Sequence, residues 1–139
     1  SAGTGIVHSE FNASEAEEVH SIQIWIEPDH EDATPAYQQI AFAPEEKQGN
    51  LRLLAAPAGG ATVIHQDVKL YVTALAPKQG VSYPVPSGRA AWVQVVRGNI
   101  SLNGHALDEG DAAAMVDESN VALQGAGPQG GELLLFDLR

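Results

Sequence analysis

The chain has 139 residues, contains no cysteine and carries a formal net charge of −11. This length suits one ordinary domain. The absence of cysteine excludes a disulfide scaffold, a thiol nucleophile and a zinc site built on thiolates. Because only 7 basic residues stand against 18 acidic ones, the basic footprint that nucleic-acid binding requires is missing, and we expect no nucleic-acid partner.

The apolar runs are too short for a transmembrane helix. The longest, Leu133–Phe136, is far below the roughly 18–20 residues of a membrane span, so we expect no membrane association. A cysteine-free sequence is compatible with a reducing compartment, and we predict a cytoplasmic location. The chain starts at Ser1 with neither a methionine nor a targeting peptide, which we interpret as a processed or truncated N-terminus.

The charge is distributed unevenly along the chain. Ten carboxylates and no lysine or arginine precede Lys47, so residues 1–46 carry −10 of the net charge of −11. The rest of the chain is nearly neutral. This step in charge and composition predicts a domain boundary near residues 43–50.

The first predicted elements are one strand and two single helical turns. The turns are expected at Ser14–Glu17, where a serine and a glutamate have capping-box spacing, and at Ala43–Gln48, where a proline stands early. Between them, Val19–Ile26 alternates with period two and places its isoleucines on one face. This alternation predicts a half-buried strand.

Further short strands separated by Gly, Pro and Asn turns favour an all-β barrel or sandwich. Asn103-Gly104 is the strongest hairpin signal, because both residues of such a turn need a positive φ. The remaining predicted strands are Val68–Leu75, Ala91–Val96, Ile100–Leu102, His105–Leu107, Ala112–Val116, Val121–Gln124 and Glu132–Leu138, the last after a Gly/Pro-rich stretch at Gly125–Gly131.

A histidine and a carboxylate two positions apart are the strongest candidates for chemistry. In an extended chain His8 and Glu10 point to the same side, about 6.6 Å apart along the backbone. An imidazole and a carboxylate on one side suit a first-row transition metal. Two donors do not complete a metal site, and a surface histidine and glutamate near a chain end are the alternative interpretation.

The other histidines give weaker signals. His20 and His65 stand at strand starts and are interpreted as structural or hydrogen-bonding residues. His30 lies in an acidic loop, and His105 follows a hairpin turn, where we expect it to be exposed. No Ser–His–Asp triad can be assembled, and the sequence has no G-x-S-x-G elbow.

Gly5, His8 and Asn12 have the spacing G-x2-H-x3-N, which resembles the second half of the second cupin motif, although Gly3 stands where that motif has a proline. Beyond this motif, nearly the whole chain resembles the bacterial pirin-like proteins, with matching segments in the family's order. The segments that carry the resemblance are Ser1–Asn12, Ile22–Pro28, His65–Leu75, Trp92–Gly104 and Leu133–Leu138.

The resemblance implies a bicupin, in which one polypeptide forms two cupin-type, jelly-roll-like β-barrels. Residues 1–43 would be the C-terminal part of the first barrel, and residues 44–139 the complete second barrel. The family's first barrel binds a metal, often iron, through an upstream H-x-H pair and a His and a Glu of the second motif. The last two match His8 and Glu10, whereas the H-x-H pair has no counterpart in this chain.

The second barrel lacks the side chains of a cupin metal site. A first-motif H-x-H would fall within Tyr83–Gly88 and the acidic ligand near Ala90–Ala91, and neither segment holds such a residue. The second-motif histidine is also missing from Ala112–Asn120. The resemblance implies the same, because the family's C-terminal barrel carries no metal.

The resemblance further implies a metal-dependent dioxygenase, similar to quercetin 2,3-dioxygenase, that cleaves a flavonol ring with O2. His8 would be a metal ligand, and Glu10 a ligand or the base that takes the flavonol proton. The cofactor would be a divalent transition metal, and iron is the metal that the resemblance favours. We expect this chain alone to be inactive, because the upstream H-x-H ligands are absent.

Two other expectations follow from the same segments. A non-catalytic cupin interaction module, binding a protein partner through its acidic face, is the alternative to the enzyme. An incomplete first barrel would also expose strand edges and an apolar face, which promote association. We therefore expect self-association through residues 1–43.

Overall fold

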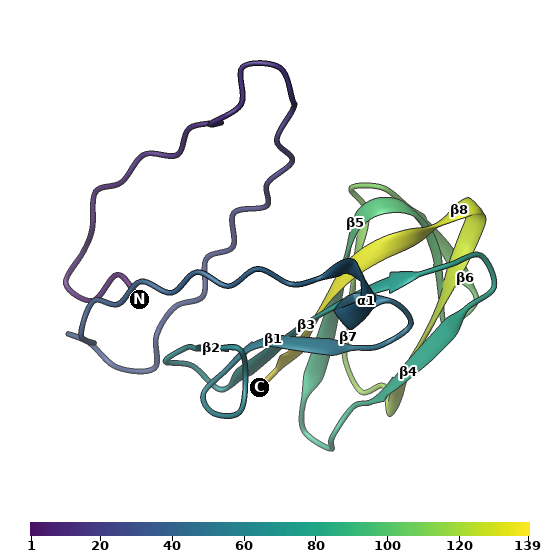
Figure 1. The fold of residues 1–139 in the computed structure, drawn as a ribbon. Coiled ribbons are helices and arrows are strands. Elements are labelled where there is room, and N and C mark those ends of the chain that lie inside the picture. The colour runs from purple at the N-terminus through teal and green to yellow at the C-terminus, as the bar shows by residue number, and fades with distance from the viewer.

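The computed structural model describes residues 1–139, and its regular elements all lie after residue 43. They are α1 (Pro44–Lys47), β1 (Arg52–Ala56), β2 (Thr62–Val63), β3 (Val68–Leu75), β4 (Gly80–Pro84), β5 (Ala90–Leu102), β6 (His105–Asp108), β7 (Ala112–Met115) and β8 (Asn120–Leu138). Figure 1 shows the strands curling around a common interior, whereas the first 43 residues form an irregular loop beside them. The predicted all-β class is confirmed.

The single helical turn α1 forms where the sequence predicts it. Pro44 stands at its first position, where its missing N–H costs nothing. The Glu46 carboxylate accepts a hydrogen bond from the Ala43 N–H at 2.9 Å, and Gln48 returns to an extended conformation. The Gly49 N–H then donates to the Ala74 carbonyl at 2.8 Å, which attaches the turn to β3.

Strand β8 organises the sheet. Its 19 residues pair antiparallel with β3 and β5 along the second half and with β4 and β5 along the first. The 13-residue β5 also carries β6 and β7, while β1 and β2 lie beyond β3. Two long central strands therefore hold every other strand, directly or through β3.

The expected break in β8 is wrong. The sequence predicts two strands separated by Gly125–Gly131, but the structure has one strand that bends there. Gly127 and Gly130 take φ values of 61° and 73°, which a residue with a Cβ rarely adopts. A Cβ on Gly130 would lie 1.9 Å from the Leu75 carbonyl oxygen, so this bend needs glycine for both conformation and space.

The interior of the strands is filled with apolar side chains. Its central cluster has 12 buried members, among them Val93, Ile100, Leu133 and Leu135. A second cluster of four, including Leu70 and Leu134, lies on the opposite face of β3 and β8. Alternate residues of these two strands therefore face two different cores, as strand geometry requires.

The predicted hairpin at Asn103-Gly104 is confirmed. These two residues have φ values of 48° and 86° and connect β5 with β6. The Asn103 side chain also accepts a hydrogen bond from the Ala122 N–H at 2.7 Å and donates to the Asn120 carbonyl at 3.2 Å. The turn residue thus attaches the hairpin to the start of β8.

The predicted strand Val19–Ile26 does not form. Its alternation suits a strand, but its backbone groups find no partner strand among residues 1–139, and a strand without a partner is not stable in water. The Ser14 hydroxyl accepts hydrogen bonds from the N–H groups of Ala16 and Glu17, as a cap does, yet no helical turn follows. Strands β1, β2 and β4 are additional to the predicted ones. Strand β2 has only two residues, β1 contains no β-branched residue, and β4 begins and ends with the turn-forming residues Gly and Pro.

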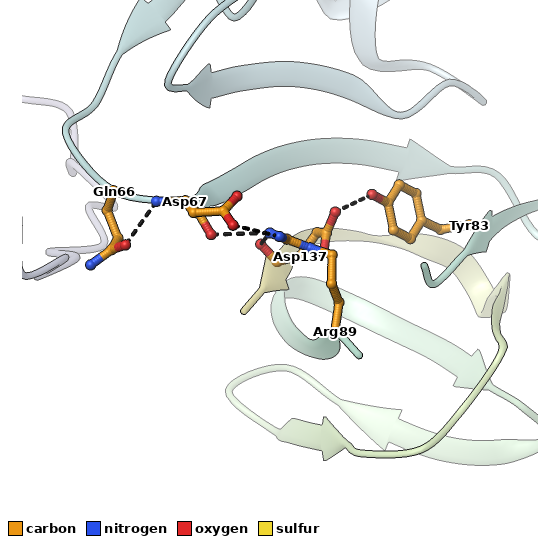
Figure 2. Close-up of polar contacts among 5 residues, drawn as sticks. All are labelled: Gln66, Asp67, Tyr83, Arg89 and Asp137. Carbon is orange, nitrogen blue, oxygen red and sulfur yellow. Dashed lines mark hydrogen bonds and ion pairs between the residues drawn. The ribbon is translucent and has the colours of Figure 1, made fainter. Parts of the chain in front are cut away.

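A buried network of polar side chains closes one end of the barrel (Figure 2). Asp137 in β8 is completely buried and accepts hydrogen bonds from the Arg89 guanidinium and, at 2.5 Å, from the Tyr83 hydroxyl. Arg89 also donates to the Asp67 carboxylate at 2.9 Å and to the Asp67 carbonyl at 3.0 Å. The network therefore connects the starts of β3 and β5 with β4 and the end of β8.

The pKa values follow from these contacts. Burial first, and then the hydrogen bond to Asp137, raise the pKa of the Tyr83 hydroxyl. Burial alone would lower the pKa of Arg89, but its bonds to Asp137 and Asp67 outweigh that effect and raise it. The hydrogen bond from Arg89 lowers the pKa of the Asp67 carboxyl. The contact therefore stabilises the fold fully at pH values above the ordinary aspartate pKa. This stabilisation is lost as the pH falls through the lowered pKa of Asp67 in the folded chain.

Replacing Asp137 should destabilise the fold far more than replacing Asp67. Asp137→Asn leaves the Arg89 charge without its buried partner, which typically costs about 3 kcal/mol or more. Asp67→Asn removes a partner whose side chain is 47% exposed, and solvent screens the charge of such a pair, so the loss should be much smaller. Urea unfolding of both variants measures the difference, and equal losses would contradict a dominant role for the buried pair.

Gly130→Ala should destabilise the fold more than Gly59→Ala. The two glycines have nearly the same φ, 73° and 75°, so the conformational cost of alanine is matched. Only the Cβ at position 130 collides with backbone, whereas nothing lies within 4 Å of a Cβ at position 59. Overpacking of this kind costs about 1–3 kcal/mol. Thermal unfolding of both variants measures the difference, and equal shifts of Tm would show that the bend of β8 tolerates a side chain.

Candidate functional site

The structure brings His8 and Glu10 together near the N-terminus. His8 Nδ1 lies 3.8 Å from Glu10 Oε1, and the two side chains are 52% and 72% exposed. The segment is extended but unpaired, so the alternation of an extended chain suffices to place both groups on one side. The pair is open to solvent.

These residues alone do not fit a metal centre. A protein metal site of this kind needs three or four donors, and His8 and Glu10 supply two. No group of three or more His, Asp or Glu side chains lies close enough to hold a metal ion anywhere in residues 1–139. Within this chain the pair supplies two of the donors that such a site needs.

Apolar side chains occupy the interior of the barrel where the family resemblance would place ligands. Val85 stands in the segment of the first-motif histidines and is 8% exposed, and Ala91 stands at the acidic position and is 1% exposed. Both belong to the central apolar cluster, together with Met115 from β7. The interior around these positions is therefore packed with apolar side chains, and neither position offers a donor to a metal.

The remaining histidines have structural or exposed positions. The rings of His30 and His65 meet edge to face with centroids 5.1 Å apart, and the Asp29 N–H donates to the His65 carbonyl at 2.7 Å. These contacts hold the irregular N-terminal segment against the start of β3. His20 and His105 are exposed, as expected for the latter.

The network around Asp137 was missed by the sequence analysis. One signal could have indicated it, since Asp137 is the single charge inside the apolar run Leu133–Leu138 and has to be paired if that run is buried. Its partner Arg89 lies 48 positions away, and no local pattern connects the two. The network is a structural feature, because its central carboxylate is inaccessible to a ligand.

The helix α1 has four residues, and none of the helical structure could span a lipid bilayer.

Comparison with known sequences identifies relatives along the whole chain. The family model described as the quercetinase C-terminal cupin domain matches residues 53–138. The quercetin 2,3-dioxygenase of Escherichia coli K12 is 39% identical over 139 residues, which cover 99% of this chain and 58% of that protein. The chain thus spans less than two thirds of the length of this relative.

Two solved structures are similar in fold and sequence. The crystal structure of YhhW from Escherichia coli has a TM-score of 0.73 and 31% identity, over 83% of this chain and 48% of that one. The bacterial pirin YhhW in complex with nickel(II) has a TM-score of 0.70 and 33% identity, over 80% and 47% of the two chains. Since the family model covers more than half of the chain, and the eight strands have the fold of these relatives, the chain belongs to the pirin-like quercetinase family through its C-terminal cupin domain.

Proposed function

We propose that this chain is part of a metal-dependent dioxygenase that cleaves a flavonol such as quercetin with O2. The observation that carries the proposal is the His8–Glu10 pair, 3.8 Å apart, in a chain 39% identical to an Escherichia coli quercetin 2,3-dioxygenase. Because the chain covers 58% of that relative, the activity is proposed for the whole protein and not for residues 1–139 alone.

His8 and Glu10 would be two ligands of a divalent transition metal. Imidazole nitrogen and carboxylate oxygen suit such an ion, and a pirin relative has been crystallised with nickel(II). Iron is the metal we propose for this protein, from the family resemblance. The metal would supply the redox chemistry that O2 requires. Glu10 alternatively accepts the proton of the flavonol hydroxyl, for which its exposed carboxylate is accessible.

We further propose that residues 1–43 belong to a first cupin barrel, whereas residues 44–139 form the second. The proposal is supported by the contrast between the paired strands after residue 43 and the unpaired segment before it. That segment carries nine exposed large apolar side chains: Ile6, Val7, Phe11, Val19, Ile22, Ile24, Trp25, Tyr37 and Ile40. Side chains of this kind are normally covered, so a further layer of protein would pack on them. The cytoplasmic location predicted from the cysteine-free sequence stays a prediction.

The exposed apolar residues also support self-association of residues 1–139. Deleting residues 1–43 should leave a folded barrel, because the central apolar cluster and the Asp137 network lie entirely in the remainder. Light scattering should then report a monomer for residues 44–139 and a larger species for residues 1–139. A strictly monomeric longer chain, or a shorter chain without a cooperative unfolding transition, would contradict this division.

Residues 1–139 alone should not consume quercetin. Two donors do not complete a metal site, so adding iron, nickel or copper should leave the absorbance of quercetin unchanged, whereas the longer protein with its H-x-H pair should turn it over. Turnover by residues 1–139 at a rate comparable to that of the longer protein would refute the proposed ligand set.

In the longer protein, His8→Ala and Glu10→Gln should each weaken metal binding at least about 100-fold, since even residues that only support ligands change affinity 10–100-fold. Metal content after dialysis measures this independently of activity. His105→Ala, an exposed histidine in the second barrel, is the matched control and should retain full metal content.

The second candidate function is a non-catalytic module that binds a basic protein partner. The specific observation in its favour is the −10 charge of residues 1–46. Binding of such a partner would weaken with salt and would not respond to a chelator, whereas a metal-dependent enzyme would lose its activity with a chelator.

A further inference from the structure

We propose that a hollow at one end of the barrel binds a small monocarboxylate. The hollow has a volume of about 300 Å³ and lies where the β3–β4 connection, the bulged part of β5 and the glycine bend of β8 meet. It belongs entirely to the second barrel and its preceding turn, so it is independent of the His8–Glu10 pair. Its volume is at the lower end for ligand sites, which limits the occupant to a small molecule.

Arg97 supplies a positive charge that no carboxylate of the chain neutralises. It is exposed, lines the hollow and forms no ion pair. Its neighbour across the β5–β8 ladder is Glu132, but that carboxylate is held by Lys47 Nζ at 2.5 Å. Glu109, near the same bulge, accepts a hydrogen bond from the Gly98 N–H at 3.2 Å. The Arg97 guanidinium is therefore available to an external anion.

The pairing of Glu132 also removes the main obstacle to an anion in this hollow. An isolated carboxylate beside Arg97 would compete for the guanidinium and repel a negative ligand. Both side chains of the Lys47–Glu132 pair are partly buried, 27% and 24% exposed, and Lys47 Nζ lies 2.5 Å from Glu132 Oε1. The charges of Lys47 and Glu132 consequently offset each other, which leaves Arg97 as the unpaired charge among the residues that line the hollow.

Two glutamine side chains provide hydrogen-bonding groups beside the charge. Gln129 lines the hollow, and its side-chain amide makes no hydrogen bond within the chain. The side-chain amide of Gln48 donates a hydrogen bond to Gln79 Oε1 at 2.8 Å, and its side-chain oxygen Oε1 remains free to accept one. A ligand with a carboxylate and one amide or hydroxyl group would match the guanidinium and these amides together.

The floor of the hollow is fixed backbone. Gly98, Gly130 and Gly131 lie so close to neighbouring backbone that a Cβ on any of them would come within 2.7 Å of a carbonyl oxygen. The floor therefore changes little when a ligand enters, which lowers the cost of binding. Arginine recognises a carboxylate through two parallel hydrogen bonds, a geometry that lysine does not provide.

The test uses N-acetylglycine as the carboxylate and N-acetylglycinamide as its neutral analogue. Titration of residues 1–139, followed by amide NMR shifts, should give saturable shifts at Gly98, Gly130 and Gly131 with a Kd on the order of millimolar for the acid only. Arg97→Gln should weaken binding at least about tenfold, the loss expected for a hydrogen bond to a charged group. Arg97→Lys keeps the positive charge but cannot form two parallel hydrogen bonds. Its Kd should therefore lie between that of the unchanged chain and that of Arg97→Gln.

Arg52→Gln is the matched control, because Arg52 is also exposed but lies near Glu46 at 3.5 Å, away from the hollow. It should leave the Kd unchanged. Three results would overturn the proposal: no saturable shift, equal shifts with the neutral analogue, or equal weakening by Arg52→Gln, which would indicate unspecific attraction of anions. Since Arg97 is exposed, the variants should keep the dispersed spectrum of the folded chain, and this is verified in the same experiment.

Discussion

The backbone pairing of β8 is the constraint on which the rest of the structure depends. This strand pairs with β3, β4 and β5 and places its alternate side chains in two apolar clusters. It can do so only because its glycines allow a bend without interrupting the strand. At its end it carries Asp137, whose bonds to Arg89 and Tyr83 close the barrel. Sheet, core and buried charge therefore meet in one segment.

The same bend creates the features that lie outside the core. The glycines of β8 approach the β3–β4 connection so closely that they form the floor of the hollow beside Arg97. The interior of the barrel, in contrast, is filled by residues such as Val85 and Ala91. This packing agrees with the position of the proposed metal ligands in residues 1–43 and not inside this barrel.

Local signals were sufficient for part of the fold and of the site. Strand β3 has the bounds that alternation predicts, the Asn103-Gly104 turn has the positive φ values that its sequence requires, and α1 begins at its proline. His8 and Glu10 are neighbours because they are two positions apart in an extended chain. Val19–Ile26 shows the limit of such signals, since alternation indicates a capacity to pair but cannot supply the partner.

The sequence by itself determined the all-β class, the absence of thiol chemistry, the concentration of negative charge before Lys47 and the spacing of the candidate ligands. These properties depend on composition or on neighbours along the chain. Only the tertiary structure decided that β8 is one bent strand, that Arg89 finds Asp137 across 48 positions, and that Arg97 is left unpaired because Lys47 holds Glu132. Each of these depends on contacts between distant segments, and their energies are set by burial and distance, which the order of residues does not reveal.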